Sequence, residues 1–157
     1  MRNLSELKIN EKGKPVGRPS PTNEALKEFQ SHFGVMLPES YIMLLRHSNG
    51  GHPQVDSIEP IGRPLAARWA VNRFYHLDGD INSAANLWNA TEKWRKILGE
   101  KTIPFADDGG GNQFFIDLKP SIPSVKLCVH DEKFAIVDIA PSFEAFIDAL
   151  SIDPDMI

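Results

Sequence analysis

A connection of only three residues, Asp-Glu-Lys at 131–133, separates two strand-like apolar runs at 125–130 and 134–139. Parallel neighbours need a crossover of about a dozen residues or more, so these two strands have to pair antiparallel. A third run, 113–118, precedes them across a loop that holds two prolines. The runs at 113–118 and 134–139 are apolar at most positions, which predicts a sheet covered on both faces. The last third of the chain therefore predicts an antiparallel sheet.

Helix signals lie before and after these strands. Thr22 is a suitable N-cap and Gly34 a suitable end for a helix with one apolar face. Pro38 suits the first turn of a second helix, which the Ser-Asn-Gly-Gly turn at 48–51 ends. Ser142 caps a last helix whose phenylalanine and aliphatic residues recur at helical spacing.

The middle of the chain is less regular. Residues 51–64 contain three prolines and predict a long loop, and residues 69–77 predict an aromatic, β-branched strand. Residues 83–98 predict a third helix with one apolar flank. Trp88 and Trp94 of this helix are expected to be core anchors and not binding platforms.

Together these elements predict a single α+β domain, a mostly antiparallel sheet flanked by helices, in the order (β)-α-α-β-α-β-β-β-α. The optional first strand is Leu7–Ile9, inside an extended and partly flexible lead-in at residues 1–20. Residues 21–157 form one domain, as the chain length of 157 residues suggests. With 41% hydrophobic and 24% charged residues, the composition excludes a disordered or fibrous chain.

The sequence predicts a cytoplasmic protein with no membrane segment. No apolar run reaches the roughly 18 residues that a membrane-spanning helix needs. The first 15 residues have no apolar core and do not resemble a secretory signal. The single cysteine, Cys128, can form neither an internal disulfide nor a zinc framework.

Charge is distributed unevenly along the chain, whose formal net charge is −4. Residues 1–20 carry a net charge of +3, residues 21–99 are balanced, and residues 100–157 hold eleven acids against four lysines. An acidic surface repels nucleic acid and attracts basic proteins. The alternative is that this is simply a solvated face that keeps the protein soluble.

The stretch Phe-Ala-Asp-Asp-Gly-Gly-Gly-Asn at 105–112 is the least ordinary in the chain. A phosphate-binding loop would lead into a helix, whereas these glycines lead into a strand and follow two acids. A Ca²⁺ loop needs regularly spaced oxygen ligands, and neither this stretch nor the Asp-Gly-Asp-Ile-Asn-Ser run at 78–83 provides the full pattern. We therefore expect a tight turn that launches a strand, with no metal and no cofactor.

No arrangement of residues typical of an enzyme is present. There is no G-x-S-x-G elbow and no H-E-x-x-H motif. Cys128 and His130 share a strand face, but a lone cysteine on a buried strand is usually a packing residue. The sequence therefore predicts a non-catalytic protein.

Three motifs in order resemble the signature of the SUKH superfamily, the Smi/Knr cell-wall-assembly-regulator-like domains. The first motif comprises Leu37, Pro38, Glu39, Tyr41, Asn49, Gly50 and Gly51. The second comprises Ile103, Phe105, Ala106, Asp107, Gly109, Gly110, Gly111, Asn112 and Phe114, and the third Ser142, Phe143 and Phe146. Residues 52–82 match no pattern of the family.

The resemblance implies an α+β fold and a role that needs no catalysis. Many bacterial members resemble immunity proteins that bind and neutralise toxins, often nucleases or deaminases, and eukaryotic relatives are regulatory scaffolds of cell-wall synthesis. Because the motif residues are mostly glycines, prolines, asparagines and aromatics, they are expected to specify the fold and not the partner.

The resulting hypothesis is that acidic residues bind a basic toxin domain and block its active site, while one or two aromatics supply affinity. The predicted contact residues are Asp107, Asp108, Asn112, Asp131, Glu132, Asp56, Glu59 and Trp69. Two alternatives stay open: a regulatory scaffold of the cell-wall type, and a small-ligand or metal-binding regulator that uses the Asp–Gly loop. Neither nucleic acid nor a membrane is an expected partner.

Overall fold

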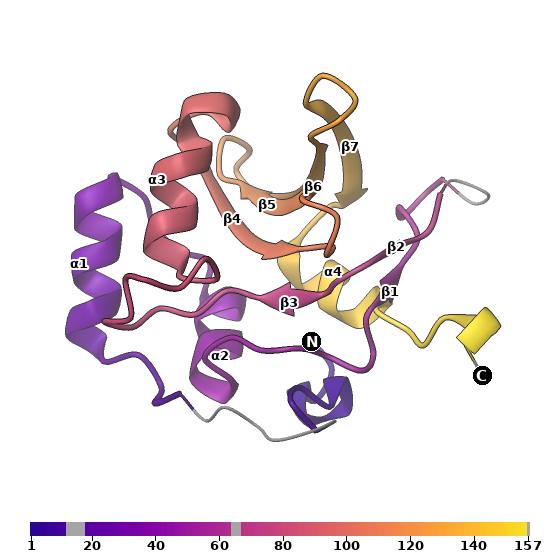
Figure 1. Ribbon diagram of the computed structural model, residues 1–157, viewed down its shortest axis with the longest axis horizontal. Helices are drawn as coiled ribbons and strands as arrows, with labels where there is room; N and C mark the ends of the chain where they lie inside the picture. The colour runs from indigo at the N-terminus through magenta and orange to yellow at the C-terminus, as the bar shows by residue number, and fades with distance from the viewer. Residues whose placement is uncertain (12–17, 64–66, 157) are drawn as a thin grey trace.

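A computed structural model describes residues 1–11, 18–63 and 67–156 of the chain (Figure 1). Its centre is a five-stranded antiparallel sheet in the order β3-β4-β5-β6-β7. The strands are β3 (Arg73–Phe74), β4 (Thr102–Asp107), β5 (Gln113–Asp117), β6 (Ser124–Val129) and β7 (Ala135–Ala140). The last four follow one another as a meander, as the short turn at 131–133 requires. The predicted α+β domain with an antiparallel sheet is confirmed.

Helices cover the two faces of this sheet unequally. Helices α2 (Glu39–His47) and α4 (Phe143–Ala149) pack on one face, where the rings of Tyr41 and Phe143 surround Phe105 of β4. Among the described residues, α3 (Leu87–Leu98) is the one helix on the other face, and α1 (Asn23–Phe33) lies beside α3 and away from the sheet (Figure 1). Adjacent strand residues point to opposite faces, so Phe114 joins the large core and Phe115 the small cluster under α3.

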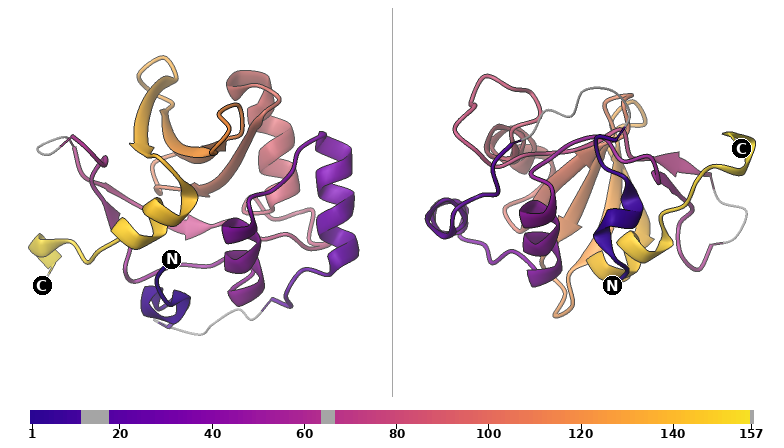
Figure 2. Two further views of the ribbon diagram at one scale, coloured as in Figure 1. Left: turned by 180° about the vertical axis from the view of Figure 1, so that it is seen from behind. Right: turned by 90° about the horizontal axis from the view of Figure 1, so that it is seen from below.

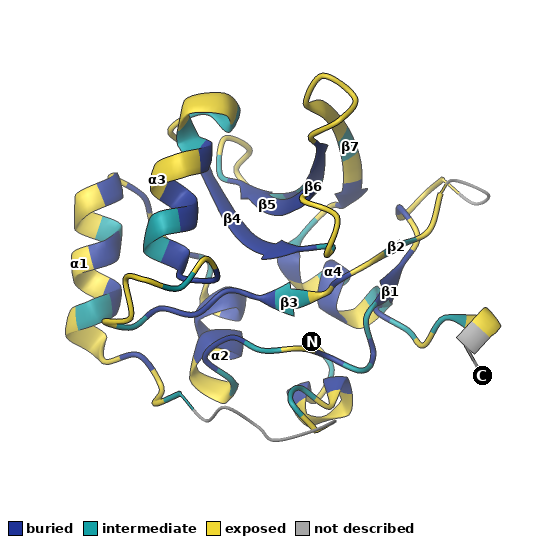
Figure 3. Ribbon diagram, viewed as in Figure 1, coloured by how far each residue is buried: buried dark blue, intermediate teal, exposed yellow. Residues whose placement is uncertain are grey.

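The sheet is strongly curved, and α3 and the β6–β7 hairpin rise on either side of β5 (Figure 2). Helix α3 therefore covers β4 and β5 but leaves the outer part of β7 open. In the burial colouring of Figure 3, β4 and β5 are buried throughout, whereas the first half of β7 is exposed. The predicted coverage of both faces is confirmed for β5 and wrong for β7, in which Ile136 is 48% exposed.

The N-terminal segment packs against the domain. Residues Leu4–Leu7 form a short 3-10 helix, η1, and both leucines are buried. The Arg2 guanidinium donates hydrogen bonds to the carbonyls of Ile147 and Leu150 at the end of α4. The optional strand at Leu7–Ile9 is not formed. Much of the predicted flexible lead-in, residues 12–17, lies outside the described residues.

Four predictions for the middle of the fold were wrong. The predicted loop 51–64 contains a short strand, β1, at residues 57–58. The predicted strand 69–77 is two strands in different sheets, because β2 (Trp69–Ala70) pairs with β1 (Ser57–Ile58) and only β3 joins the main sheet. Strand β4 was not predicted, since Pro104 argues against a central strand. Its proline lies beside a β-bulge, where a missing N–H is tolerated. The predicted helix 83–98 begins only at Leu87, because Asn86 caps it.

Candidate functional site

The glycine turn between β4 and β5 is held together by its own acids. Asp107 is 6% exposed, and its Oδ1 accepts hydrogen bonds from the Gly109 N–H at 3.0 Å and the Asn72 amide at 3.1 Å. Its Oδ2 lies 2.6 Å from Nε of Arg73, the cross-strand neighbour on β3. A carboxylate with these three contacts fixes β3, β4 and the turn relative to one another.

The second acid closes the turn. Oδ1 of Asp108 accepts hydrogen bonds from the backbone N–H groups of Gly110 and Asn112, and Oδ2 accepts one from the Asn112 side-chain amide at 2.7 Å. The Asn112 side-chain oxygen in turn accepts a hydrogen bond from the N–H of His130 at 3.0 Å. All four carboxylate oxygens of Asp107 and Asp108 therefore have partners inside the protein. The structure agrees with the expected structural turn and leaves these oxygens little capacity for a metal ion.

The turn also requires glycine at one position for space. Gly111 has a φ of +94°, and a Cβ there would lie 2.9 Å from Nε2 of His130. The same His130 nitrogen lies 2.7 Å from the Gly110 carbonyl oxygen, so the imidazole ties the glycine turn to the end of β6. The two turns at this end of the sheet, 108–112 and 130–134, are thus neighbours.

A cleft of about 620 Å³ opens beside the glycine turn, on the sheet face that α3 covers. Its buried lining residues are Tyr75, Ala90, Trp94, Asp107 and Gln113, and the Tyr75 hydroxyl donates a hydrogen bond to Oε1 of Gln113 at 2.5 Å. Burial raises the pKa of the Tyr75 phenol, and the negative charge of Asp107 raises it further, so the group stays neutral. The buried part of the lining therefore combines neutral polar and aromatic side chains with one charged group, the Asp107 carboxylate.

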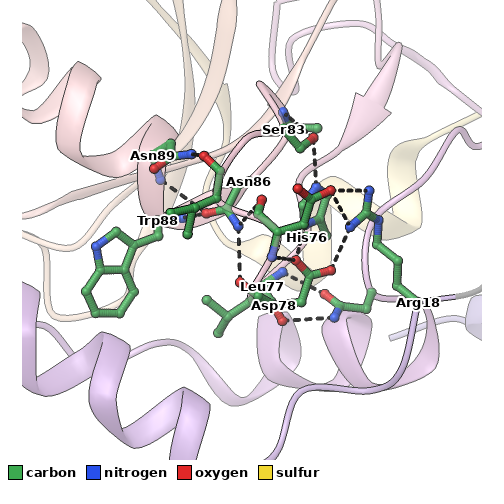
Figure 4. A network of polar contacts seen from close by, with 12 residues as sticks. Arg18, His76, Leu77, Asp78, Ser83, Asn86, Trp88 and Asn89 are labelled. Atoms are coloured by element: carbon green, nitrogen blue, oxygen red, sulfur yellow. Dashed lines mark hydrogen bonds and ion pairs between the residues drawn. The ribbon is translucent and has the colours of Figure 1, made fainter.

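One wall of the cleft is a loop, residues 78–86, that is locked by polar contacts (Figure 4). The Asn86 side-chain amide donates hydrogen bonds to the carbonyls of Asp78 and Asp80, and its oxygen caps the first N–H groups of α3. Arg18 lies 2.8 Å from the Asp78 carboxylate and 3.4 Å from that of Asp80. The Arg18 guanidinium thus pairs with both acids of the Asp-Gly-Asp run, which disfavours the binding of a metal ion there.

His76 lies behind this wall and is almost fully buried. One ring nitrogen, Nε2, lies 3.0 Å from the Ser83 hydroxyl. The other, Nδ1, lies 3.1 Å from Oδ1 of Asp78, which is close enough for an ion pair but is not aligned for a hydrogen bond. Burial lowers the pKa of His76, although the nearby Asp78 charge opposes the shift.

The charged groups of the cleft are Arg73, Lys93 and Asp107. Asp107 uses both of its oxygens on Arg73, Asn72 and Gly109, as described above. Within the described residues, the two terminal nitrogens of Arg73 make no hydrogen bond and the Lys93 ammonium has no carboxylate within 4.0 Å. The cleft therefore carries two cations with unused donors and one acid that is fully engaged.

These residues belong to a chain that matches the model of the SMI1 / KNR4 family (SUKH-1) over residues 20–149. The chain belongs to this family. It is also similar to the SPbeta prophage-derived uncharacterized protein YokK of Bacillus subtilis (strain 168). The two are 30% identical over 171 aligned positions, which cover 95% of this chain and 85% of YokK.

The SMI1 / KNR4 motif residues of this chain are mostly internal. Asn49 is buried, donates hydrogen bonds to the carbonyls of Pro19 and Leu77, and accepts one from the Leu77 N–H. Gly50 has a φ of +83°, and a Cβ there would lie 2.9 Å from Cβ of His76. Tyr41, Phe105, Phe114, Phe143 and Phe146 form one buried aromatic cluster. These motif residues stabilise the fold around the cleft, but most of the residues that line the cleft are not motif residues.

The predicted contact residues fall into two groups. Asp131 and Glu132 are exposed on the β6–β7 turn, next to the glycine turn that holds Asp107, Asp108 and Asn112. The second group lies along the small β1–β2 sheet and comprises Asp56, Glu59 and Trp69. Glu59 pairs with Arg68 at 2.7 Å. That any of these eight residues contacts a partner stays a prediction, and burial makes Asp107 and Asn112 the least accessible of them.

Sequence reasoning missed the cleft residues Arg73, Tyr75, Lys93 and Gln113, and it assigned Trp94 to the core alone. Arg73 and Tyr75 are two residues apart in the predicted strand 69–77, which is a recognisable signal for a shared face, but nothing local indicates what that face meets. Within residues 1–11, 18–63 and 67–156, no group of three or more His, Cys, Asp or Glu side chains could hold a metal ion. Over the same residues, no helix is long and apolar enough to cross a membrane.

Proposed function

We propose that this protein is a non-catalytic immunity protein that binds a cognate toxin domain, of the nuclease or deaminase type, and blocks its active site. Membership of the SMI1 / KNR4 family supports a binding role. The likeness to a prophage-derived protein fits an accessory protein of a mobile element better than a cell-wall scaffold.

The observation that carries the proposal is the contrast between the two neighbouring turns. The side-chain oxygens of Asp107, Asp108 and Asn112 in the glycine turn have partners inside the protein, whereas Asp131 and Glu132 beside it are exposed. Neither carboxylate has an ion pair or hydrogen bond among the described residues. Exposed, unpaired acids at the tip of a hairpin attract a basic partner and fix its orientation, which suits the occlusion of a nucleic-acid-binding active site.

Affinity capture from a lysate of the source organism, followed by mass spectrometry, tests this proposal. Capture at about 0.15 M and about 0.5 M salt separates charge-dependent contacts from apolar ones. We expect a basic nuclease- or deaminase-like protein that is retained less well at high salt. The double variant Asp131→Asn/Glu132→Gln should lose it.

The matched control removes two exposed acids elsewhere, Glu24→Gln and Glu28→Gln on α1, and should keep the partner. Purified partner activity, measured with and without this protein, then tests neutralisation directly. Capture of a non-toxin assembly that is indifferent to the Asp131 and Glu132 changes would contradict the proposal and favour the scaffold role.

A further inference from the structure

The cleft beside the glycine turn is electrostatically opposite to the chain as a whole. The chain has a net charge of −4, whereas the described residues that line the cleft carry two cations, Arg73 and Lys93, and one acid, Asp107, which pairs with Arg73. The Nε of Arg73 is held by Asp107, so the planar fork of its terminal nitrogens is fixed in position while its donors stay free. Such a fork matches the two oxygens of a carboxylate.

Aromatic residues supply the apolar part of the same surface. Trp94 lines the cleft, and the Lys93 ammonium lies 5.6 Å from the centre of its ring. The far side of Trp94 meets Phe134 edge-on, with 6.3 Å between ring centres. Phe134, Ile136 and Ile97 are 44%, 48% and 46% exposed and line a hollow of about 170 Å³, whose lining also includes the ion pair of Lys126 with Asp117. The cleft therefore continues, through the Trp94–Phe134 contact, to three exposed apolar side chains that lie beside charged residues.

The backbone at the hairpin tip keeps Phe134 exposed in an unfavourable conformation. Lys133 and Phe134 both have a φ of +58°, and the Ala135 N–H donates to the Glu132 carbonyl, as in a type I′ turn. Turns of this type favour asparagine or glycine at both positions, and a bulky aromatic residue in the left-handed region is an outlier. Outliers of this kind cluster at binding sites, where the strain is part of the function.

We propose that this surface binds an acidic side chain of a protein partner: Arg73 and Lys93 hold the carboxylate in the cleft, and the Phe134–Ile136–Ile97 patch receives an adjacent apolar side chain. The inference rests on the proposed binding function and names the chemistry of one segment of the partner. The surface carries acids at the exposed hairpin tip and cations in the cleft. Because the partner has to place opposite charges against each of them, it can bind in one orientation only.

The test is an NMR titration of the full ¹⁵N-labelled chain with three N-acetylated, C-amidated tripeptides, Glu-Leu-Phe, Gln-Leu-Phe and Lys-Leu-Phe. The Glu peptide should shift the Trp94 indole N–H, the Gln113 side-chain amide and the Arg73 Nε–H signals. Its affinity should exceed that of the Gln peptide by about tenfold, the usual worth of one charge-assisted contact. Lys93→Gln should remove most of this preference, and the exposed neighbour Lys96→Gln should not.

Three results of the peptide titration would overturn the inference: equal or stronger binding of the Lys peptide, no loss of preference in Lys93→Gln, or no binding of any peptide. Equal shifts with inorganic phosphate alone would show a general anion site and would also overturn it. If a toxin is captured and Lys93→Gln binds it as tightly as the unchanged protein does, the inference is wrong and the immunity role stands. If the Glu peptide binds selectively but no toxin is captured, the inference stands and the immunity role is wrong.

Discussion

Replacing Asn49 by alanine should destabilise the fold without touching the binding surface. The side chain makes three hydrogen bonds of 2.8, 2.8 and 2.9 Å that join the end of α2 to Leu77 and Pro19. The Leu77 N–H and carbonyl are buried and would lose their partners, at about 1–3 kcal/mol each. The Pro19 carbonyl can turn to water and adds little. Allowing for relaxation, we expect a loss of about 3 kcal/mol in the free energy of unfolding.

For a chain of this size, about 3 kcal/mol corresponds to a Tm lower by about 10 °C, measurable by circular dichroism. Ser48→Ala is the matched control, because it removes a single hydrogen bond, to the Gly50 carbonyl, and should cost less than about 1 kcal/mol. Asn49→Ala should keep its affinity for the partner at temperatures where it is folded. A variant with unchanged Tm and lost binding would refute the assignment of Asn49 to the fold.

Three further predictions concern buried or strained groups. Tyr41→Phe should raise stability by about 1 kcal/mol in urea unfolding, because its hydroxyl is buried without a hydrogen-bond partner among the described residues; a clear loss of stability would mean that it has one. Burial lowers the pKa of His76 in the folded state below its ordinary 6.5, so protonation favours the unfolded chain. Stability should therefore be complete above about pH 6.5 and fall as the pH drops toward the lowered pKa, and His76→Gln should flatten that part of the profile; an unchanged slope would contradict it. Lys133→Gly should stabilise the hairpin by up to about 1 kcal/mol in thermal unfolding, since relief of left-handed strain of about 1–2 kcal/mol exceeds the entropy cost of glycine. No gain would mean that the turn is unstrained.

The parts of the fold that were predictable are those fixed by local chemistry. Thr22 and Ser142 were expected as N-caps, and each side-chain oxygen accepts a hydrogen bond from the N–H three residues on. The turn at 131–133 forces antiparallel pairing whatever surrounds it. Strand β4 was missed because its Pro104 is acceptable only beside a bulge, and a bulge depends on the partner strand, which local sequence does not specify.

The cleft was less predictable than the fold because no single segment contains it. Arg73 faces Asp107 only through the register of β3 on β4, and Lys93 reaches the same space only because α3 crosses the outer face of the sheet. Counting acids along the chain favoured Asp107 and Asp108 as contacts. The count could not show that both carboxylates are used by the glycine turn itself.

Some polar side chains of this protein are hydrogen-bonded in its interior and others are exposed without an ion pair among the described residues. This difference determines which substitutions can change the choice of partner at little cost in stability. A substitution at Asp107 or Asn49 breaks buried hydrogen bonds and therefore lowers the free energy of unfolding. A substitution at Lys93, Asp131 or Glu132 removes an exposed group without an ion pair among the described residues, and exposed positions of this kind usually change stability by less than about 0.5 kcal/mol. The proposed partner surface can therefore vary while the motif residues hold the same fold, so charge reversal at Lys93 should alter which peptide is bound and leave the Tm almost unchanged.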